Sequence, residues 1–142
     1  AGDDVRRQML AAALQLLLPG MPMIYYGDEV GMTGGSDPDC RRGMLWEGSR
    51  QNQTLFHYYQ TLIHIRHQYP ALTEGTLTEQ SADDERGLIT IKRQQGRQRL
   101  RLLFHVKAGT LILPELAGRK NLVDNRDFSG ILGDFEAAVL LE

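Results

Sequence analysis

The sequence predicts two unlike halves, an α/β unit followed by an antiparallel β-sandwich-like domain. The first half carries a helical pattern, a tight break, a short apolar run and then a second, amphipathic helical pattern. After Leu72 the pattern changes to short β-prone runs separated by turn residues. We therefore expect one unit over residues 1–72 and another over residues 73–142.

Residues 3–18 are predicted to form the first helix. Asp3 and Asp4 place hydrogen-bond acceptors and negative charge at its start, which suits both capping and the helix dipole. The second half of this helix contains a single polar residue, Gln15, so it should be buried on most sides. A Pro-Gly pair ends it.

The run Met23–Tyr26 is predicted to be a buried strand, because it is bulky, β-prone and of the right length. About twenty residues rich in Gly, Asp and Arg follow it, and a loop of that length is more often functional than filler. The second helix is predicted over Gln53–Gln68, where apolar and polar residues fall on opposite faces.

The second half should consist of short antiparallel strands, because runs of this size separated by Gly and Asp are typical of a sandwich. The predicted strands are Thr76–Glu79, Leu88–Arg93, Arg99–His105, Thr110–Leu113, Lys120–Val123 and Ala137–Leu141.

Composition excludes several kinds of partner. Sixteen basic and eighteen acidic residues give a net charge of −2, so no overall field favours nucleic acid or an anionic membrane. No apolar run approaches the ~20 residues that a membrane span requires. The single cysteine, Cys40, excludes an intrachain disulfide and suits a reducing compartment. We expect a cytoplasmic protein with no nucleic-acid or membrane partner.

The segment 37–42, Asp-Pro-Asp-Cys-Arg-Arg, carries the sharpest chemical signal. Pro38 fixes its own φ and restricts Asp37, so this carboxylate is carried on a stiff backbone. A carboxylate beside a guanidinium can hold two neighbouring sugar hydroxyls, which both donate and accept hydrogen bonds. The alternative is an ion pair between Asp37 and Arg41 that only keeps the loop folded.

Other polar and aromatic residues carry weaker signals. Asp28 and Glu29 are adjacent, so their side chains diverge and cannot flank one bond. We predict that Glu29 accepts backbone hydrogen bonds, that Asp28 faces solvent or a cleft, and that neither is catalytic. The aromatic residues Tyr25, Tyr26 and Trp46 could stack on sugars, but they are expected to be wall or core residues. The histidines of the second helix share a face with glutamines, which favours a solvated surface over a metal site. No metal and no cofactor are expected.

A long run of fixed spacing follows the first helix: Met21-Pro-Met-Ile-Tyr-Tyr-Gly-Asp-Glu-Val-Gly-Met32, then Asp37-Pro-Asp-Cys-Arg-Arg42 and Met44-Leu-Trp46. It resembles the last barrel strand and following loop of the α-amylase superfamily, within it the neopullulanase, cyclomaltodextrinase and maltogenic amylase group. The resemblance implies the C-terminal part of a (β/α)8 barrel, its last strand and flanking helices, followed by an antiparallel β domain. A complete barrel needs about 250 residues, more than this chain has.

The resemblance implies a retaining glycosidase acting on α-glucosidic bonds of maltodextrins, cyclodextrins or pullulan. By resemblance Asp37 and Arg41 hold a glucose unit, while the catalytic carboxylates lie on earlier strands, so this chain alone should be inactive. The expected partners are an α-glucan oligosaccharide and, in a full-length protein, the remainder of the barrel. Self-association through exposed apolar helix faces, residues 9–18 and 55–63, is also expected. The alternatives are a stand-alone carbohydrate-binding or assembly module, or a transglycosylase or isomerase of the same superfamily.

Overall fold

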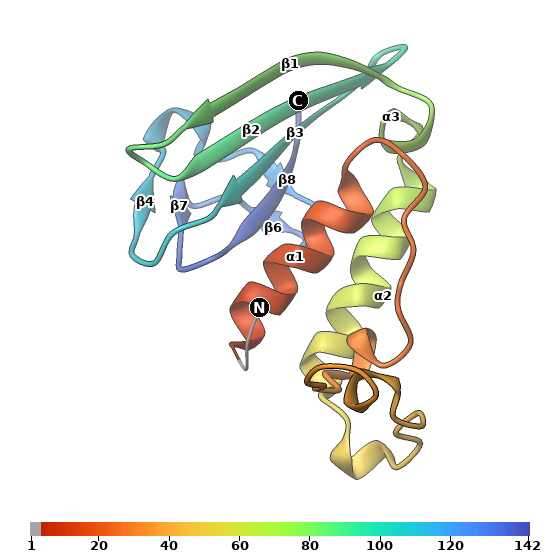
Figure 1. The fold of residues 1–142 in the computed structure, drawn as a ribbon. Coiled ribbons are helices and arrows are strands. Elements are labelled where there is room, and N and C mark those ends of the chain that lie inside the picture. The colour runs from red at the N-terminus through yellow and green to blue at the C-terminus, as the bar shows by residue number, and fades with distance from the viewer. Residues whose placement is uncertain (1–3) are drawn as a thin grey trace.

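The computed structural model describes residues 4–142 and places two helices against one face of a β-sheet (Figure 1). Helix α1 spans Val5–Leu17, helix α2 spans Gln53–Gln68, and the short α3, Pro70–Thr73, leads into the sheet. Single turns of 3-10 helix occur at η1 (Asp28–Val30), η2 (Asp39–Arg41), η3 (Gly48–Arg50) and η4 (Pro114–Leu116).

Both long helices begin at a side-chain cap. Asp4 Oδ1 accepts a hydrogen bond from the Arg6 amide at 3.0 Å, so the predicted capping by this acid is confirmed. The other predicted acid, Asp3, lies outside the described residues. Asn52 Oδ1 accepts from the Leu55 amide at 3.0 Å at the start of α2, which has the predicted bounds.

The strands form two antiparallel sheets, so the predicted β-rich second half is confirmed. The larger has the order β1-β2-β3-β8-β5-β6, and β4 pairs with β7 in the smaller one. Their bounds are β1 Thr76–Asp83, β2 Leu88–Gln95, β3 Gln98–His105, β4 Leu111–Ile112, β5 Lys120–Asn121, β6 Arg126–Asp127, β7 Ile131–Leu132 and β8 Ala137–Leu141.

The central strands β3 and β8 of the large sheet are buried on both faces. Along β3, Leu102 and Phe104 join the hydrophobic cluster of α1 and α2, whereas Leu103 between them joins the cluster beneath β4 and β7. Val139 and Leu140 of β8 divide in the same way. Because successive strand residues face opposite sides, two apolar neighbours in a strand require cover on both faces. The helices supply one cover and the small sheet the other.

The predicted buried strand Met23–Tyr26 is wrong. The residues from Met21 to Tyr25 are neither helix nor strand, and Met23 is 70% exposed. A strand needs a neighbouring backbone for its hydrogen bonds. Among the described residues, residues 21–24 have no backbone partner, and only the Gln15 side chain donates to the Met23 carbonyl. The segment therefore runs as an extended connection from α1 to η1 (Figure 1).

The apolar helix faces that we expected to be exposed are buried within this chain. Leu16 and Leu17 of α1 and Leu55 and Leu62 of α2 are at most 2% exposed, because the two helices pack on each other and on the sheet. Exposed apolar surface lies instead on the connection, where Met21 is 96% exposed. Within residues 4–142, no helix combines the length and apolar character needed to cross a bilayer.

Arg66, in the last turn of α2, is a buried cation at the end of α1. Its Nη1 donates to the carbonyls of Leu16 at 2.6 Å and Leu18 at 3.2 Å, and its Nη2 donates to Gly20 O at 2.6 Å. A guanidinium at these unpaired carbonyls also interacts favourably with the helix dipole. Arg66 thereby fixes where the extended connection leaves α1.

Candidate functional site

Two glycines fix the turn that follows the extended connection. Gly27 and Gly31 have φ values of 94° and 74°, which residues with a Cβ rarely adopt, and η1 lies between them. A Cβ on Gly27 would lie 2.6 Å from Met32 Sδ. The carbonyl of the buried Val30 accepts a hydrogen bond from the Asn52 amide at 2.9 Å. The turn is thus tied to the start of α2.

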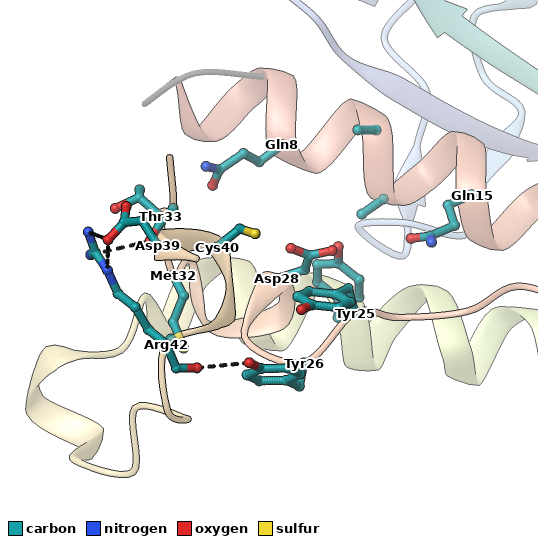
Figure 2. Close-up of a pocket in the computed structure, with 14 residues that line it drawn as sticks. Gln8, Gln15, Tyr25, Tyr26, Asp28, Met32, Thr33, Asp39, Cys40 and Arg42 are labelled. Carbon is teal, nitrogen blue, oxygen red and sulfur yellow. Dashed lines mark hydrogen bonds and ion pairs between the residues drawn. The ribbon is translucent and has the colours of Figure 1, made fainter. Parts of the chain in front are cut away.

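The adjacent acids of this turn have different surroundings. The Gly27 amide donates to Glu29 Oε2 at 2.8 Å, so the prediction that Glu29 accepts a backbone hydrogen bond is confirmed. Asp28 instead lines a cavity, beside the ring of Tyr25 (Figure 2). The prediction that Asp28 faces a cleft is therefore also confirmed.

This cavity has a volume of about 610 Å³ and lies between α1 and the loop (Figure 2). Gln8 and Gln15 line it from α1. The loop contributes Tyr25, Tyr26, Asp28, Asp39, Cys40 and Arg42. Its size is that of a small-molecule site, and the amides, acids and tyrosines can both donate and accept hydrogen bonds.

A network centred on Asp39 closes the loop. Its Oδ1 accepts from Arg42 Nε and its Oδ2 accepts from the Gly35 amide, each at 2.7 Å. The Tyr26 hydroxyl donates to Arg42 O at 2.9 Å, which joins the loop to the extended connection. The Gly35 amide and the Arg42 guanidinium both hold the pKa of Asp39 below its usual value. The network thus maintains a charged carboxylate and a fixed guanidinium in the cavity wall.

The pKa of Asp28, the other acid that lines the cavity, is shifted in the opposite direction to that of Asp39. Burial raises the pKa of Asp28, and the neighbouring charge of Glu29 raises it further. Burial also raises the pKa of Tyr59, which lines the cavity from α2, to about 12, with the charges of Asp28 and Glu29 contributing. Carboxylate charge is therefore unfavourable at this position of the fold.

Replacing Asp28 with asparagine should stabilise the protein at neutral pH. The folded state binds the Asp28 proton more tightly than the unfolded chain does. The protein therefore loses stability as pH rises above the pKa that Asp28 has in the unfolded chain. Asp28→Asn should raise the melting temperature at pH 7, and the gain should vanish below about pH 3, where the acid is protonated in both states. Melting curves between pH 3 and pH 8 measure this. Asp84→Asn, at an exposed turn acid, is the control, and a lower melting temperature for Asp28→Asn at pH 7 would contradict the assignment.

The two residues predicted to hold a sugar, Asp37 and Arg41, are brought together. Arg41 Nε lies 2.9 Å from Asp37 Oδ1, and the two side chains are 70% and 63% exposed, respectively. They lie on the loop beside the cavity but do not line it, whereas Asp39 and Arg42 do. An ion pair this exposed contributes about 0–1 kcal/mol, so it adds little to the stability of the loop.

Comparison with known proteins gives the family context of this geometry. No protein-family model matches the sequence. The chain is 40% identical over 104 residues to a cyclomaltodextrinase of Geobacillus thermopakistaniensis (strain MAS1), a match that covers 73% of this chain and 18% of that protein. It is 44% identical over 92 residues to neopullulanase 2 of Thermoactinomyces vulgaris, covering 65% of this chain and 16% of that protein. The crystal structure of a maltogenic amylase from S. marinus matches 96% of this chain with a TM-score of 0.85 at 26% identity.

The chain is a homologue of the cyclomaltodextrinase, neopullulanase and maltogenic amylase group. The resemblance seen in the sequence is therefore confirmed. The chain spans less than a fifth of the length of either curated relative, and 19% of the maltogenic amylase structure. Those relatives are α-amylase-family glycosidases.

The sequence alone did not reveal every residue of this site. Tyr25 and Tyr26, each 43% exposed, line the first cavity, whereas Trp46 is 83% exposed and is not part of a core. Asp39 and Arg42 stand in the same hexapeptide as the predicted pair, and their three-residue spacing was the available signal. In the part of the chain that the structure describes, no three His, Cys, Asp or Glu side chains form a group that could hold a metal ion.

Proposed function

We propose that this chain is the C-terminal part of a retaining glycoside hydrolase acting on α-glucosidic bonds of maltodextrins, cyclodextrins or pullulan. In this proposal residues 1–72 complete a (β/α)8 barrel and residues 73–142 form the C-terminal antiparallel β domain. The relatives' names and the likeness to a maltogenic amylase structure support it. Residues 21–24 have no backbone partner among the described residues, and Met21 and Met23 are exposed, as a barrel strand without its neighbours would be.

The chain's own contribution is a substrate-binding pair rather than a catalytic group. The observation that carries this step is the geometry of Asp37 and Arg41, which are in contact, exposed and largely free to bind. Among the described residues, Arg41 uses only Nε for Asp37, so both of its Nη groups remain available. Asp37 Oδ2 likewise has no bond with a described residue. Of two neighbouring hydroxyls of a glucose unit, one could donate to Asp37 Oδ2 and the other could accept from the Nη groups of Arg41.

Catalysis is assigned to residues outside this chain. Retaining glycosidases need two carboxyl groups about 5–5.5 Å apart on either side of the bond that breaks. Of the adjacent acids, Glu29 is engaged by a backbone amide and diverges from Asp28. The chain alone therefore binds α-glucan without cleaving it. A reducing compartment, the cytoplasm, fits the single exposed cysteine.

A second candidate is a stand-alone carbohydrate-binding module. One hydrophobic cluster joins α1 and α2 to β2, β3 and β8, which favours a unit that folds without further segments. Both candidates use the same glucan-binding pair. They differ in whether catalytic carboxylates accompany it in the protein that the cell makes, which the flanking coding sequence decides.

The binding pair is tested by calorimetry with maltoheptaose. Asp37→Asn should weaken binding about ten- to hundredfold, because hydrogen bonds to charged groups contribute about 1.5–3 kcal/mol. Arg41→Met should have a similar effect, and the double variant should lose less than the sum because both groups hold one sugar unit. Asp127→Asn, on the exposed β6, is the matched control and should bind as the unchanged chain does. Equal affinity for the unchanged chain and all four variants would refute the assignment.

A further inference from the structure

Trp46 is the single tryptophan of the chain, and 83% of it is exposed. A tryptophan ring offers a large apolar face, which is usually buried or used in an interface. This ring lies on the loop four residues after the Asp39 network, in the stretch between η2 and η3. Its exposure is not accounted for by the pair Asp37 and Arg41.

A second cavity, of about 480 Å³, lies beside this ring. Met32, Met44, Leu45 and Trp46 form the apolar part of its lining. Polar groups stand around it as well. Arg50 and Glu47, whose charged atoms approach to 3.8 Å, line it together with Arg42.

This combination fits a sugar ring. A pyranose has an apolar C–H face that packs on an aromatic ring, and hydroxyls around its edge that need both donors and acceptors. Trp46 supplies the aromatic face, and Glu47 with Arg50 supplies acceptor and donor. Nucleobases also stack on aromatic rings, but they come with phosphates that require a basic groove. The chain has a net charge of −2, so a neutral ligand is favoured.

The two cavities adjoin. Met32, Thr33 and Arg42 line both of them, and Figure 2 shows these three side chains on the loop side of the first cavity. Asp39 and Tyr26 hold Arg42 in place, so the shared wall is fixed. The Asp37 and Arg41 pair lines neither cavity, but Arg41 directly precedes Arg42 in the chain, so the pair and the second cavity belong to the same loop.

We propose that Trp46 and this second cavity form an additional subsite for α-glucan, which binds chains longer than those held by Asp37 and Arg41 alone. The inference rests on the proposed function, because it assumes that the loop binds α-glucan. It assigns the loop a preference for chain length, with Trp46 as the stacking platform and the Glu47 and Arg50 pair as the hydroxyl contact.

The single tryptophan makes the test direct, because all indole fluorescence of the chain comes from Trp46. Bound maltoheptaose should shield the ring from quenching by acrylamide and lower the Stern–Volmer constant, whereas maltose should leave it unchanged. Cellohexaose, with β-linked glucose units, is the control ligand. Calorimetry is run in parallel with both α-linked sugars.

Substitution separates this inference from the proposed function. Trp46→Ala should weaken the binding of maltoheptaose about tenfold, which is the effect expected from losing one aromatic contact. It should change the affinity for maltose less than twofold. Trp46→Phe should restore most of the binding. Because the ring is exposed, the thermal melt of Trp46→Ala should match that of the unchanged chain.

The outcomes are distinguishable. If maltoheptaose binds but the quenching and the Trp46→Ala affinity are unchanged, the subsite is wrong and the Asp37 and Arg41 proposal stands. If neither maltose nor maltoheptaose binds the unchanged chain, both proposals fail. If shielding occurs equally with cellohexaose, the platform does not select α-glucan and the inference fails.

Discussion

Phe104→Ala should lower the free energy of unfolding by about 3–5 kcal/mol, the range for removing a large aromatic side chain from a packed core. Phe104 is 0% exposed and lies on the face of β3 that packs against the helices. On the sheet it is paired with Ile89 of β2 and Ala137 of β8, so little can move in to fill the space. Since small domains are stable by only about 5–15 kcal/mol, this is a large share of the total. Urea denaturation measures the change.

Ile112→Ala is the matched control, because this strand residue is 61% exposed and its truncation should cost well under 1 kcal/mol. The prediction also concerns cooperativity. Helical circular dichroism and a sheet probe should report the same lowered midpoint for Phe104→Ala, since one cluster joins the helices and the sheet. A sheet that melts early beneath helices with an unchanged midpoint would show that the two parts have separate cores.

Arg66→Met should cost about 2–4 kcal/mol, although it preserves a side chain of similar length. The change removes three hydrogen bonds from a buried guanidinium and leaves the carbonyls of Leu16 and Gly20 without their donor. Loss of the Arg66 charge also has a stabilising effect. The charge of Arg66 lowers the pKa of the buried Arg93, in addition to the larger effect of burial, so removing Arg66 relieves a repulsion. Denaturant unfolding gives the net value.

The control for Arg66→Met is Arg97→Met at an exposed turn position, which should change stability by less than about 0.5 kcal/mol. Amide exchange provides a local measurement. Loss of Arg66 should speed exchange at the end of α1 and along the extended connection, before it affects β3. Equal stability of the two variants would mean that the carbonyls at the end of α1 find water instead, and that Arg66 does not position the connection.

Much of the fold follows from local sequence. Helix α2 has the predicted bounds because Asn52 supplies a cap and apolar residues recur with helical spacing up to Tyr69. β8 also has its predicted bounds, and β3 differs from its prediction by one residue at the start. These elements carry strong periodicity over many residues. In such segments, local preference and tertiary packing agree.

Elements that depend on distant partners were predicted less well. Strands β6 and β7 have two residues each and exist because β5 and β4 lie beside them, so no pattern in the sequence marks them. β1 runs to Asp83, four residues beyond its predicted end at Glu79, because it continues to pair with β2. The run Met23–Tyr26 shows the reverse case. Its composition favours a strand, but no neighbouring backbone in the described chain pairs with it.

Some contacts of the candidate site could be predicted from the sequence, and others could not. The contact between Asp37 and Arg41 follows from their four-residue spacing across η2. The contact between Asp39 and Arg42 follows in the same way from a three-residue spacing, but the hydrogen bond from the Gly35 amide to Asp39 is set by how the loop folds back. Trp46 was misjudged because its residue type favours burial. Only the structure shows that nothing in the described chain covers it.

Amide chemical-shift mapping with maltoheptaose tests the central claim most directly, namely that the loop around Asp37 and Arg41 binds α-glucan. We expect saturable shifts confined to residues 33–50 and to the connection beside them, which need about ten- to hundredfold more maltoheptaose in Asp37→Asn and are absent with cellohexaose. Edge strand β1, exposed along its whole length, should not respond. Shifts that centre on the β domain, or no shifts at millimolar maltoheptaose, would contradict it.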